Sequence, residues 1–175
     1  MKNRMRIIFI VATLMAGCRT IPEKTADLDR REFYQEIATH DPEAMAKIKR
    51  APLKLLNKYL FPEHTPLDVA VTHHNFPAAQ LLIERGVNVN RGASDGNTPL
   101  LSATQGNDKQ MVRLLLVAGA NPNQKNRSGE TPLDLAFYEN SHTAGAVLKE
   151  FGATFSRVMR EKHNQFDAAT WFESL

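Results

Sequence analysis

Two adjacent histidines and three scattered serines are the side chains of this sequence that could take part in catalysis or bind a metal ion. His73 and His74 follow one another, so on a helix their rings would point about 100° apart and could not easily share one metal. Ser94, Ser128 and Ser141 lie in predicted turns without the strand-to-helix context of a nucleophile elbow. The sequence has no His-Glu-x-x-His segment, no pair of cysteines and no glycine-rich phosphate loop. It therefore predicts a protein without enzymatic activity, metal site or cofactor.

Cys18 is the only cysteine of the chain, and its context predicts a lipid attachment. The cations Lys2, Arg4 and Arg6 precede an apolar run over residues 7–16, which is too short to span a bilayer and is typical of a signal peptide. The run ends in Leu-Met-Ala-Gly-Cys, which resembles the bacterial lipobox, although that family usually has leucine three residues before the cysteine. The resemblance implies cleavage before Cys18 and transfer of a diacylglycerol to its thiol. An ordinary signal peptide with an incidental cysteine is the alternative.

The residue after the cysteine bears on location. It is Arg19 rather than the aspartate that, by the same resemblance, would retain a lipoprotein in the inner membrane. We therefore expect a lipid anchor in the outer membrane, facing the periplasm. The lipidated cysteine and a polar tether would then occupy residues 18–29.

The charge balance argues against nucleic acid as a partner. The full chain carries 22 lysines and arginines against 19 acidic residues, and cations within the signal peptide account for the whole net charge of +3. A mature chain near neutrality lacks the phosphate-neutralising excess that dominates nucleic-acid affinity. One local run has five cations and no acidic residue between them: Lys47, Lys49, Arg50, Lys54 and Lys58. A solvated helix and loop would account for this run; contact with an acidic partner or an anionic membrane surface is the alternative.

The feature that organises the chain is a repeated phrase. Thr-Pro-Leu begins three times at equal intervals of 33 residues: Thr65, Thr98 and Thr131. Each copy runs through a leucine-rich segment to a glycine 21 residues after the threonine: Gly86, Gly119 and Gly152. A strict period of this length indicates an array of one repeated unit.

The chemistry of the phrase predicts how each unit folds. Threonine can cap a helix N-terminus, and proline suits the first helical position. In two copies an aspartate three residues after the threonine, Asp68 or Asp134, can reach back to the cap residue's N–H as a short capping box. The later glycine can adopt the left-handed conformation that ends a second helix. Each unit is therefore predicted to be a helix, a tight turn, an antiparallel helix and a polar loop.

These segments resemble the ankyrin repeat, whose signature is Thr-Pro-Leu-His-x-Ala with a Leu-Leu-x-x-Gly-Ala ending. The resemblance covers about residues 65–154 and implies an all-α solenoid of about four stacked helix-turn-helix units with a C-terminal capping helix. The signature histidine is replaced by Asp68, Leu101 and Asp134, and the glycine between the helices is replaced by His74, Asn107 and Asn140. Asparagine tolerates a left-handed turn better than histidine does, so the first of these turns departs most from the family.

The flanks are predicted to close the array. Residues 28–64 look like a degenerate entry repeat, in which Asp41 and Pro42 begin a second helix. The apolar stretch over residues 51–64 either packs over the first groove or forms a contact arm. A closing helix is expected over residues 155–175, with Trp171 and Phe172 either packed against the array or offered to a partner. The expected organisation is a signal peptide (1–17), lipidated cysteine and tether (18–29), ankyrin-repeat domain (30–154) and closing helix (155–175).

In the ankyrin family the free concave surface comes from the loop tips before each Thr-Pro and from exposed positions late in each first helix. Carried over by position, the resemblance implies these partner-binding candidates: Phe61, His64, Thr72, His73, Ser94, Asp95, Asn97, Gln105, Arg127, Ser128, Glu130, Tyr138 and Glu139. The aromatic residues and Arg127 suit interface anchoring, because Tyr, Trp and Arg dominate interaction hot spots.

Two functions are compatible with this sequence. The first is a tethered protein-binding module, monomeric when free, and most specifically an immunity protein. Short lipoproteins with a few ankyrin repeats resemble periplasmic partners that neutralise phospholipase effectors of type VI secretion systems. The second is a housekeeping scaffold that docks a resident envelope protein.

Overall fold

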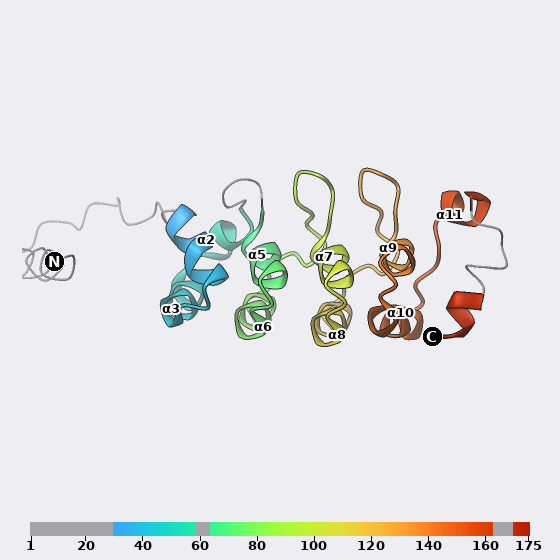
Figure 1. Cartoon of the computed structure of the whole chain (residues 1–175). Coiled ribbons are helices and arrows are strands. Elements are labelled where there is room, and N and C mark those ends of the chain that lie inside the picture. The colour runs from blue at the N-terminus through green and yellow to red at the C-terminus, as the bar shows by residue number, and fades with distance from the viewer. Residues whose placement is uncertain (1–29, 59–63, 163–169) are drawn as a thin grey trace, which may run out of the picture.

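The computed structural model describes residues 30–58, 64–162 and 170–175. Within these ranges the chain is helical and contains no strand. The helices are α2 (Arg30–Ala38), α3 (Pro42–Arg50), α4 (Leu53–Leu56), α5 (Pro66–Thr72), α6 (Phe76–Glu84), α7 (Pro99–Gln105), α8 (Lys109–Val117), α9 (Pro132–Tyr138), α10 (His142–Glu150) and α11 (Arg157–Lys162). Four helical hairpins, α2/α3, α5/α6, α7/α8 and α9/α10, stack side by side in one row (Figure 1). This confirms the predicted all-α ankyrin-type solenoid.

The first helix of each Thr-Pro-Leu unit begins at the predicted cap. Thr65, Thr98 and Thr131 are the N-cap residues of α5, α7 and α9, and a proline occupies the first turn of each helix. Both predicted capping boxes are present, and the backbone N–H groups of Thr65 and Thr131 each donate to the following aspartate at 2.9 Å. Local side-chain chemistry therefore fixes where each repeat starts.

The turn inside each hairpin is left-handed, whichever residue occupies it. His40, His74, Asn107 and Asn140 have φ angles of 59°, 54°, 48° and 53°. Histidine thus takes the same conformation as asparagine, and the departure of His74 from the family pattern does not change the turn. The predicted left-handed helix ends are also confirmed, because Gly86, Gly119 and Gly152 have φ angles of 79°, 90° and 77°.

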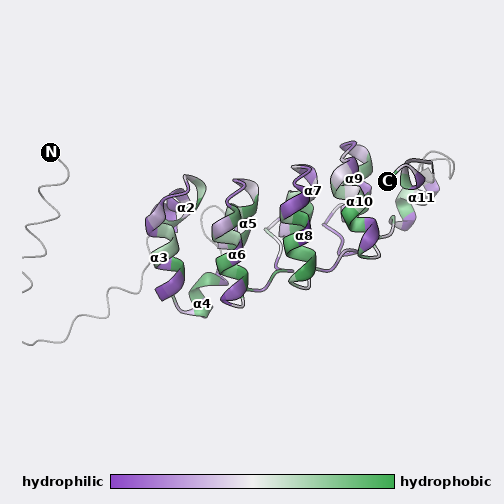
Figure 2. Ribbon diagram, turned by 90° about the horizontal axis from the view of Figure 1, so that it is seen from below, coloured by the Kyte–Doolittle hydropathy of each residue, from purple (hydrophilic) through white to green (hydrophobic). Residues whose placement is uncertain are grey.

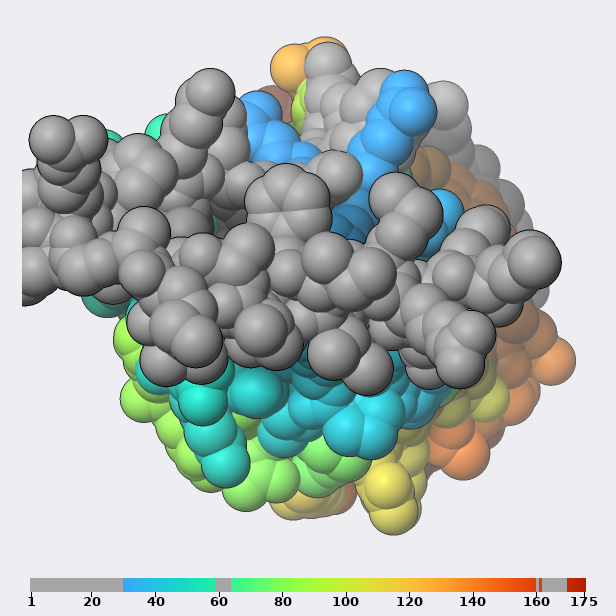
Figure 3. All heavy atoms as spheres, turned by 90° about the vertical axis from the view of Figure 1, so that its left-hand side faces the viewer, coloured from blue at the N-terminus to red at the C-terminus, as the bar shows by residue number. Residues whose placement is uncertain are grey.

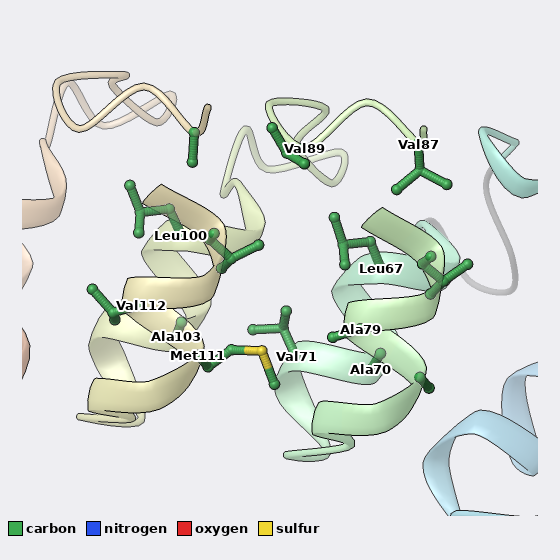
Figure 4. Close-up of a cluster of buried hydrophobic side chains, with 14 of the residues drawn as sticks. Leu67, Ala70, Val71, Ala79, Val87, Val89, Leu100, Ala103, Met111 and Val112 are labelled. Atoms are coloured by element: carbon green, nitrogen blue, oxygen red, sulfur yellow. The ribbon is translucent and has the colours of Figure 1, made fainter. Parts of the chain in front are cut away.

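The buried residues of the core follow the 33-residue period of the sequence. Two sets of leucines, each spaced by 33 residues and almost inaccessible to solvent, line the first and second helices: Leu67, Leu100 and Leu133, then Leu82, Leu115 and Leu148. Ala70 and Ala103 occupy equivalent buried positions in α5 and α7, where a small side chain lets neighbouring helices approach closely (Figure 4). Met111 of α8 reaches toward Val71 of the preceding repeat (Figure 4). Each repeat therefore completes its core only against its neighbours.

A row of asparagine side chains links consecutive repeats on the polar side of the stack. The Oδ1 atoms of Asn57, Asn90 and Asn123 accept hydrogen bonds from backbone N–H groups 31 residues further along, at 2.8, 2.7 and 2.7 Å. Those donors belong to Asn88, Asn121 and Thr154. The three asparagines follow the 33-residue period, so Asn57 extends that period into the entry repeat. We call this row the asparagine ladder.

The entry repeat has the predicted hairpin. Asp41 caps α3 by accepting from Glu43 N–H at 2.8 Å, and Pro42 is the first helical residue. In the stretch after α3, Leu56 is buried in the core, whereas Leu53 is 42% exposed. Of the apolar residues predicted for this stretch, those at 59–63, Phe61 among them, lie outside the described residues.

The helix that the structure describes in the C-terminal segment begins two residues later than the closing helix expected over residues 155–175. Helix α11 begins only at Arg157, because Ser156 caps it by accepting from Met159 N–H at 3.1 Å. A second helical turn covers residues 170–173, and residues 163–169 lie outside the described part. Within α11, Met159 is 1% exposed, whereas its neighbour Val158 is 50% exposed.

Trp171 packs against the last repeat, which is the first of the two alternatives expected for the C-terminus. Its ring centroid lies 5.5 Å from that of Phe137 and 5.4 Å from that of His142. The contact with α10 is close: a Cβ atom added to Gly145 would lie 2.7 Å from Cη2 of Trp171 and 3.1 Å from the methyl groups of Leu175. The absence of a side chain at Gly145 therefore makes the seat for the C-terminal residues.

Candidate partner-binding surface

Two loops of the same shape project from the stack, one before α7 and one before α9 (Figure 1). In the first, Ala93 N–H donates to the carbonyl of Asn97 at 2.8 Å; in the second, Asn126 N–H donates to that of Glu130 at 3.0 Å. The turn of each loop contains a glycine with a positive φ angle, which is 81° at Gly96 in the first loop and 82° at Gly129 in the second. We call residues 93–97 and 126–130 the two finger loops.

Side chains inside each finger loop hold its tip in one conformation. In the first loop, Asp95 accepts from the backbone N–H of Asn97 at 2.9 Å and from its amide at 2.7 Å. In the second, Asn126 accepts from the backbone N–H of Glu130 at 3.0 Å and donates to its carboxylate at 2.8 Å. Each loop is therefore ordered by its own polar groups before a partner arrives.

The two finger loops are also bonded to each other. The amide of Asn126 donates to Oδ1 of Asn97 at 3.1 Å, and Arg127 N–H donates to the carbonyl of Asp95 at 3.3 Å. A Cβ atom on Gly96 would lie 3.0 Å from the Arg127 backbone nitrogen and 3.2 Å from its Cγ. The stem of Arg127 thus lies against Gly96, and the two loops form one continuous polar surface.

The ends of the first helices border this surface. Gln105, Tyr138 and Glu139 are exposed at or next to the C-terminal ends of α7 and α9, and Tyr138 is 49% exposed. Thr72 is exposed at the end of α5 and donates its hydroxyl to the carbonyl of Asp68 at 2.8 Å. Because α5, α7 and α9 pack directly on one another, these side chains form a row along the array.

A family model describing ankyrin repeats in three copies matches residues 67–157, just over half of the 175 residues. The chain belongs to the ankyrin-repeat family. No curated protein matches the chain. Ankyrin repeats generally serve as non-catalytic binding scaffolds, so the fold indicates a module for protein–protein interaction.

The ankyrin surface brings together some of the predicted partner-binding residues and separates others. Four of them belong to one hydrogen-bonded group that is completed by Asn126: Asp95, Asn97, Arg127 and Glu130. Ser94 and Ser128 lie at the loop tips, and the row of helix ends contains Thr72, Gln105, Tyr138 and Glu139. His64 is half-buried immediately before the Thr65 cap, and Phe61 lies outside the described residues. That these residues bind a partner remains a prediction.

His73 is held by the entry repeat of the ankyrin array. Its Nε2 lies 3.5 Å from the Tyr34 hydroxyl, and the two rings meet edge to face with centroids 6.0 Å apart. His74 turns away from its neighbour, and its Nδ1 lies 3.0 Å from Oδ2 of Asp108. Although burial opposes the effect, the hydrogen bond with His74 lowers the pKa of Asp108. The two histidines therefore have separate partners.

Asn126 and Tyr34 contribute to this surface although the ankyrin pattern did not point to them. Asn126 makes the side-chain bond between the finger loops, but its counterpart one repeat earlier is Ala93, so no repeated residue marks its role. Tyr34 lies in the entry repeat, which lacks the signature phrase. Only the folded chain places these residues beside the predicted ones.

Ser94 stands in a Gly-Ala-Ser-Asp-Gly segment that has the spacing of a nucleophile elbow. The surrounding structure is different from an elbow, because residues 94–96 form a loop turn and α7 begins only at Pro99. Among the described residues, no hydrogen bond joins Ser94 to a histidine. Also within the described ranges, no group of three or more His, Cys, Asp or Glu side chains could hold a metal ion.

A buried carboxyl group lies in the capping box at the start of α5. Asp68 is 1% exposed, and burial raises its pKa to about 6 in spite of the two hydrogen bonds that it accepts from Thr65. The charges of His64 and Asp95 also influence it, in opposite directions. Asp134, its counterpart, accepts an additional bond from Ser156 N–H at 2.9 Å. Each aspartate therefore serves the capping box of its own repeat.

The predicted anchor at Cys18 lies outside the described residues. None of the helices that the structure describes is both long enough and apolar enough to cross a bilayer.

Proposed function

We propose that this ankyrin-repeat chain is a lipid-anchored immunity protein, which binds a toxic phospholipase effector in the periplasm and neutralises it by covering a face of the enzyme. The observation that carries the proposal is the bonded pair of finger loops beside the row of exposed helix ends. This surface presents Arg127 and Tyr138, the residue types that most often anchor protein interfaces.

Preorganisation supports tight binding by this surface. Association normally costs free energy for ordering loops and side chains at the interface. Here Asp95, Asn97, Asn126 and Glu130 already hold the finger loops through hydrogen bonds of 2.7–3.1 Å. A rigid polar surface of this kind suits a stoichiometric inhibitor, whose only task is to occupy its target.

The N-terminal sequence supports the location. Lipidation at Cys18 would hold the ankyrin array at the periplasmic face of the outer membrane, where a lipid-degrading toxin acts. The specific target class rests on the resemblance to ankyrin-type immunity lipoproteins, and the coarser role, binding a protein, rests on the family.

The test replaces the two proposed anchors and measures both binding and protection. Arg127→Ala with Tyr138→Ala should weaken partner binding by several kcal/mol, since truncating a hot-spot residue costs about 2 kcal/mol or more. It should change the free energy of unfolding by less than about 0.5 kcal/mol per site, because both side chains are exposed. Cells that produce this variant should be killed by an effector that the parent protein resists.

A matched control alters an exposed pair on the opposite side of the hairpins. Arg113→Ala with Val117→Ala on α8 removes an arginine and a 73% exposed apolar side chain far from the finger loops (Figure 1). This control should bind and protect like the parent protein. Full protection by the folded Arg127/Tyr138 variant would place the binding surface elsewhere. Capture of a resident envelope protein, with no protection against any effector, would instead favour the housekeeping scaffold.

A further inference from the structure

Four cations gather at the N-terminal end of the array. Lys49 and Arg50 end α3, and Lys54 and Lys58 lie in and just after α4; all four side chains are exposed. No acidic residue interrupts the sequence from 49 to 58. Among the described residues, none of these four cations forms an ion pair. We call these residues the basic corner.

The fifth cation of the run does not belong to this corner. Lys47 lies one turn earlier on α3, and its ammonium contacts the Glu36 carboxylate at 2.5 Å and that of Glu32 at 3.8 Å. Burial opposes ionisation of Lys47, but these carboxylates together raise its pKa. Its charge is therefore compensated within the entry repeat, whereas the charges of the basic corner face solvent.

The backbone under the basic corner is fixed. The Arg85 guanidinium, from the end of α6, donates to the carbonyls of Ile48 and Ala51 at 2.8 and 2.7 Å and also to that of Lys49. On the other side, Leu56 anchors α4 in the core at 1% exposure. The four cations thus extend from a rigid platform rather than from a loose loop.

One apolar side chain stands among the cations. Leu53, the first residue of α4, is 42% exposed. Figure 2 shows α4 as a mainly hydrophobic turn beside the hydrophilic end of α3, and Figure 3 shows this part of the chain, in cyan, on the N-terminal face of the molecule. An exposed leucine close in the chain to lysine and arginine is the combination that enters the headgroup layer of an anionic bilayer.

We infer that the basic corner rests on the anionic phospholipid surface of the membrane and orients the array on it. Lysine and arginine near such a surface each contribute about fivefold to the partition constant. The corner lies at the end of the array from which the N-terminal segment departs. Only 11 residues lie between Cys18 and Arg30, so a lipid on Cys18 would keep that end within about 40 Å of the bilayer. The finger loops of later repeats would then extend away from the membrane.

The test compares vesicles of phosphatidylcholine alone with vesicles that also contain phosphatidylglycerol, using the full chain without a lipid on Cys18. The apolar run over residues 7–16 contributes to both vesicle types, and the cations Lys2, Arg4 and Arg6 add the same preference for phosphatidylglycerol to the parent chain and to every variant. The measured quantity is therefore the change that a substitution causes in the ratio of the two partition constants. For the parent chain this ratio should be well above one at low salt and should fall at high salt. Lys54→Gln with Lys58→Gln should lower the ratio roughly 25-fold.

Two further variants keep the inference open to refutation. Lys109→Gln with Lys125→Gln removes the same charge from exposed lysines of the later repeats and should leave the ratio nearly unchanged. Leu53→Ser should weaken binding to phosphatidylglycerol vesicles by roughly threefold if about 25 Å² of its side chain enters the headgroup layer. If both double-lysine variants lowered the ratio equally, net charge alone would explain the binding, and the inference would be overturned. An unchanged ratio in the Lys54/Lys58 variant would overturn it as well, and would leave the basic corner to an acidic protein.

Discussion

Replacing Gly145 by alanine tests whether the C-terminal residues lie on α10. In an unobstructed helix this change would stabilise the protein by about 1 kcal/mol, because alanine is the better helix former. Here the new methyl group would meet Cη2 of Trp171 at 2.7 Å and Leu175 at 3.1 Å. Overpacking of this kind costs about 1–3 kcal/mol, unless the C-terminal segment moves away. We therefore expect a net loss of up to about 2 kcal/mol in the free energy of unfolding.

The assay uses the fact that Trp171 is the only tryptophan of the chain. Gly145→Ala should move its fluorescence emission to longer wavelength and make it easier to quench with acrylamide. Urea unfolding followed by circular dichroism gives the change in stability independently. In a Trp171→Ala background most of the obstruction is gone, so the same substitution should cost less or become favourable. A gain of about 1 kcal/mol in the parent background, with unchanged emission, would refute the packing of Trp171 on α10.

The remaining predictions concern the core, a buried charge and the anchor. Leu115→Ala should cost about 2–5 kcal/mol in urea melts, because this 0% exposed side chain lies in the central repeat and its loss leaves a cavity. Val117→Ala on the same helix should cost less than about 0.5 kcal/mol, because its side chain is exposed. Similar costs for the two substitutions would contradict the assigned core. Burial raises the pKa of Asp68 from 3.8 to about 6, so the folded state holds the proton more tightly than the unfolded chain does. The free energy of unfolding should therefore fall by up to about 3 kcal/mol as the pH rises from about 4 to about 6. Asp68→Asn should remove this part of the pH dependence. Identical pH profiles for the parent protein and the variant would argue against a raised pKa at Asp68. Cys18→Ser should release the chain from washed membranes, and its retention there in the absence of a partner would count against lipidation.

The fold could be predicted because its determinants are local and repeated. The threonine cap and the proline of each unit, and the aspartate of two units, act within one helical turn, and the terminal glycines act at one residue, so spacing alone located them. The asparagine ladder was equally periodic, yet Asn57 lies in a stretch whose other residues do not follow the period. Its role became visible only with the bond to Asn88 N–H.

The sequence predicted where the residues of the candidate surface lie, but not the hydrogen bonds that join them. Register placed Asp95, Asn97, Arg127 and Glu130 at loop tips, but the bonds between the loops join residues about 30 positions apart. Asn126 makes the central one, and no residue of the preceding repeat marks its importance. The seat of Trp171 likewise depends on a missing side chain in α10, and a single glycine within a helix does not reveal which residue will use the space.

The asparagine ladder also bears on how such a chain can change its length. Each of its asparagines serves the repeat that follows, through a donor 31 residues further along. A tandem duplication of one whole 33-residue unit would supply a new acceptor and a new donor together, and every existing bond would find its usual partner. An insertion of any other length between two ladder residues would separate the acceptor from its donor and leave both without their hydrogen bond. The array can therefore gain or lose length only by whole 33-residue repeats.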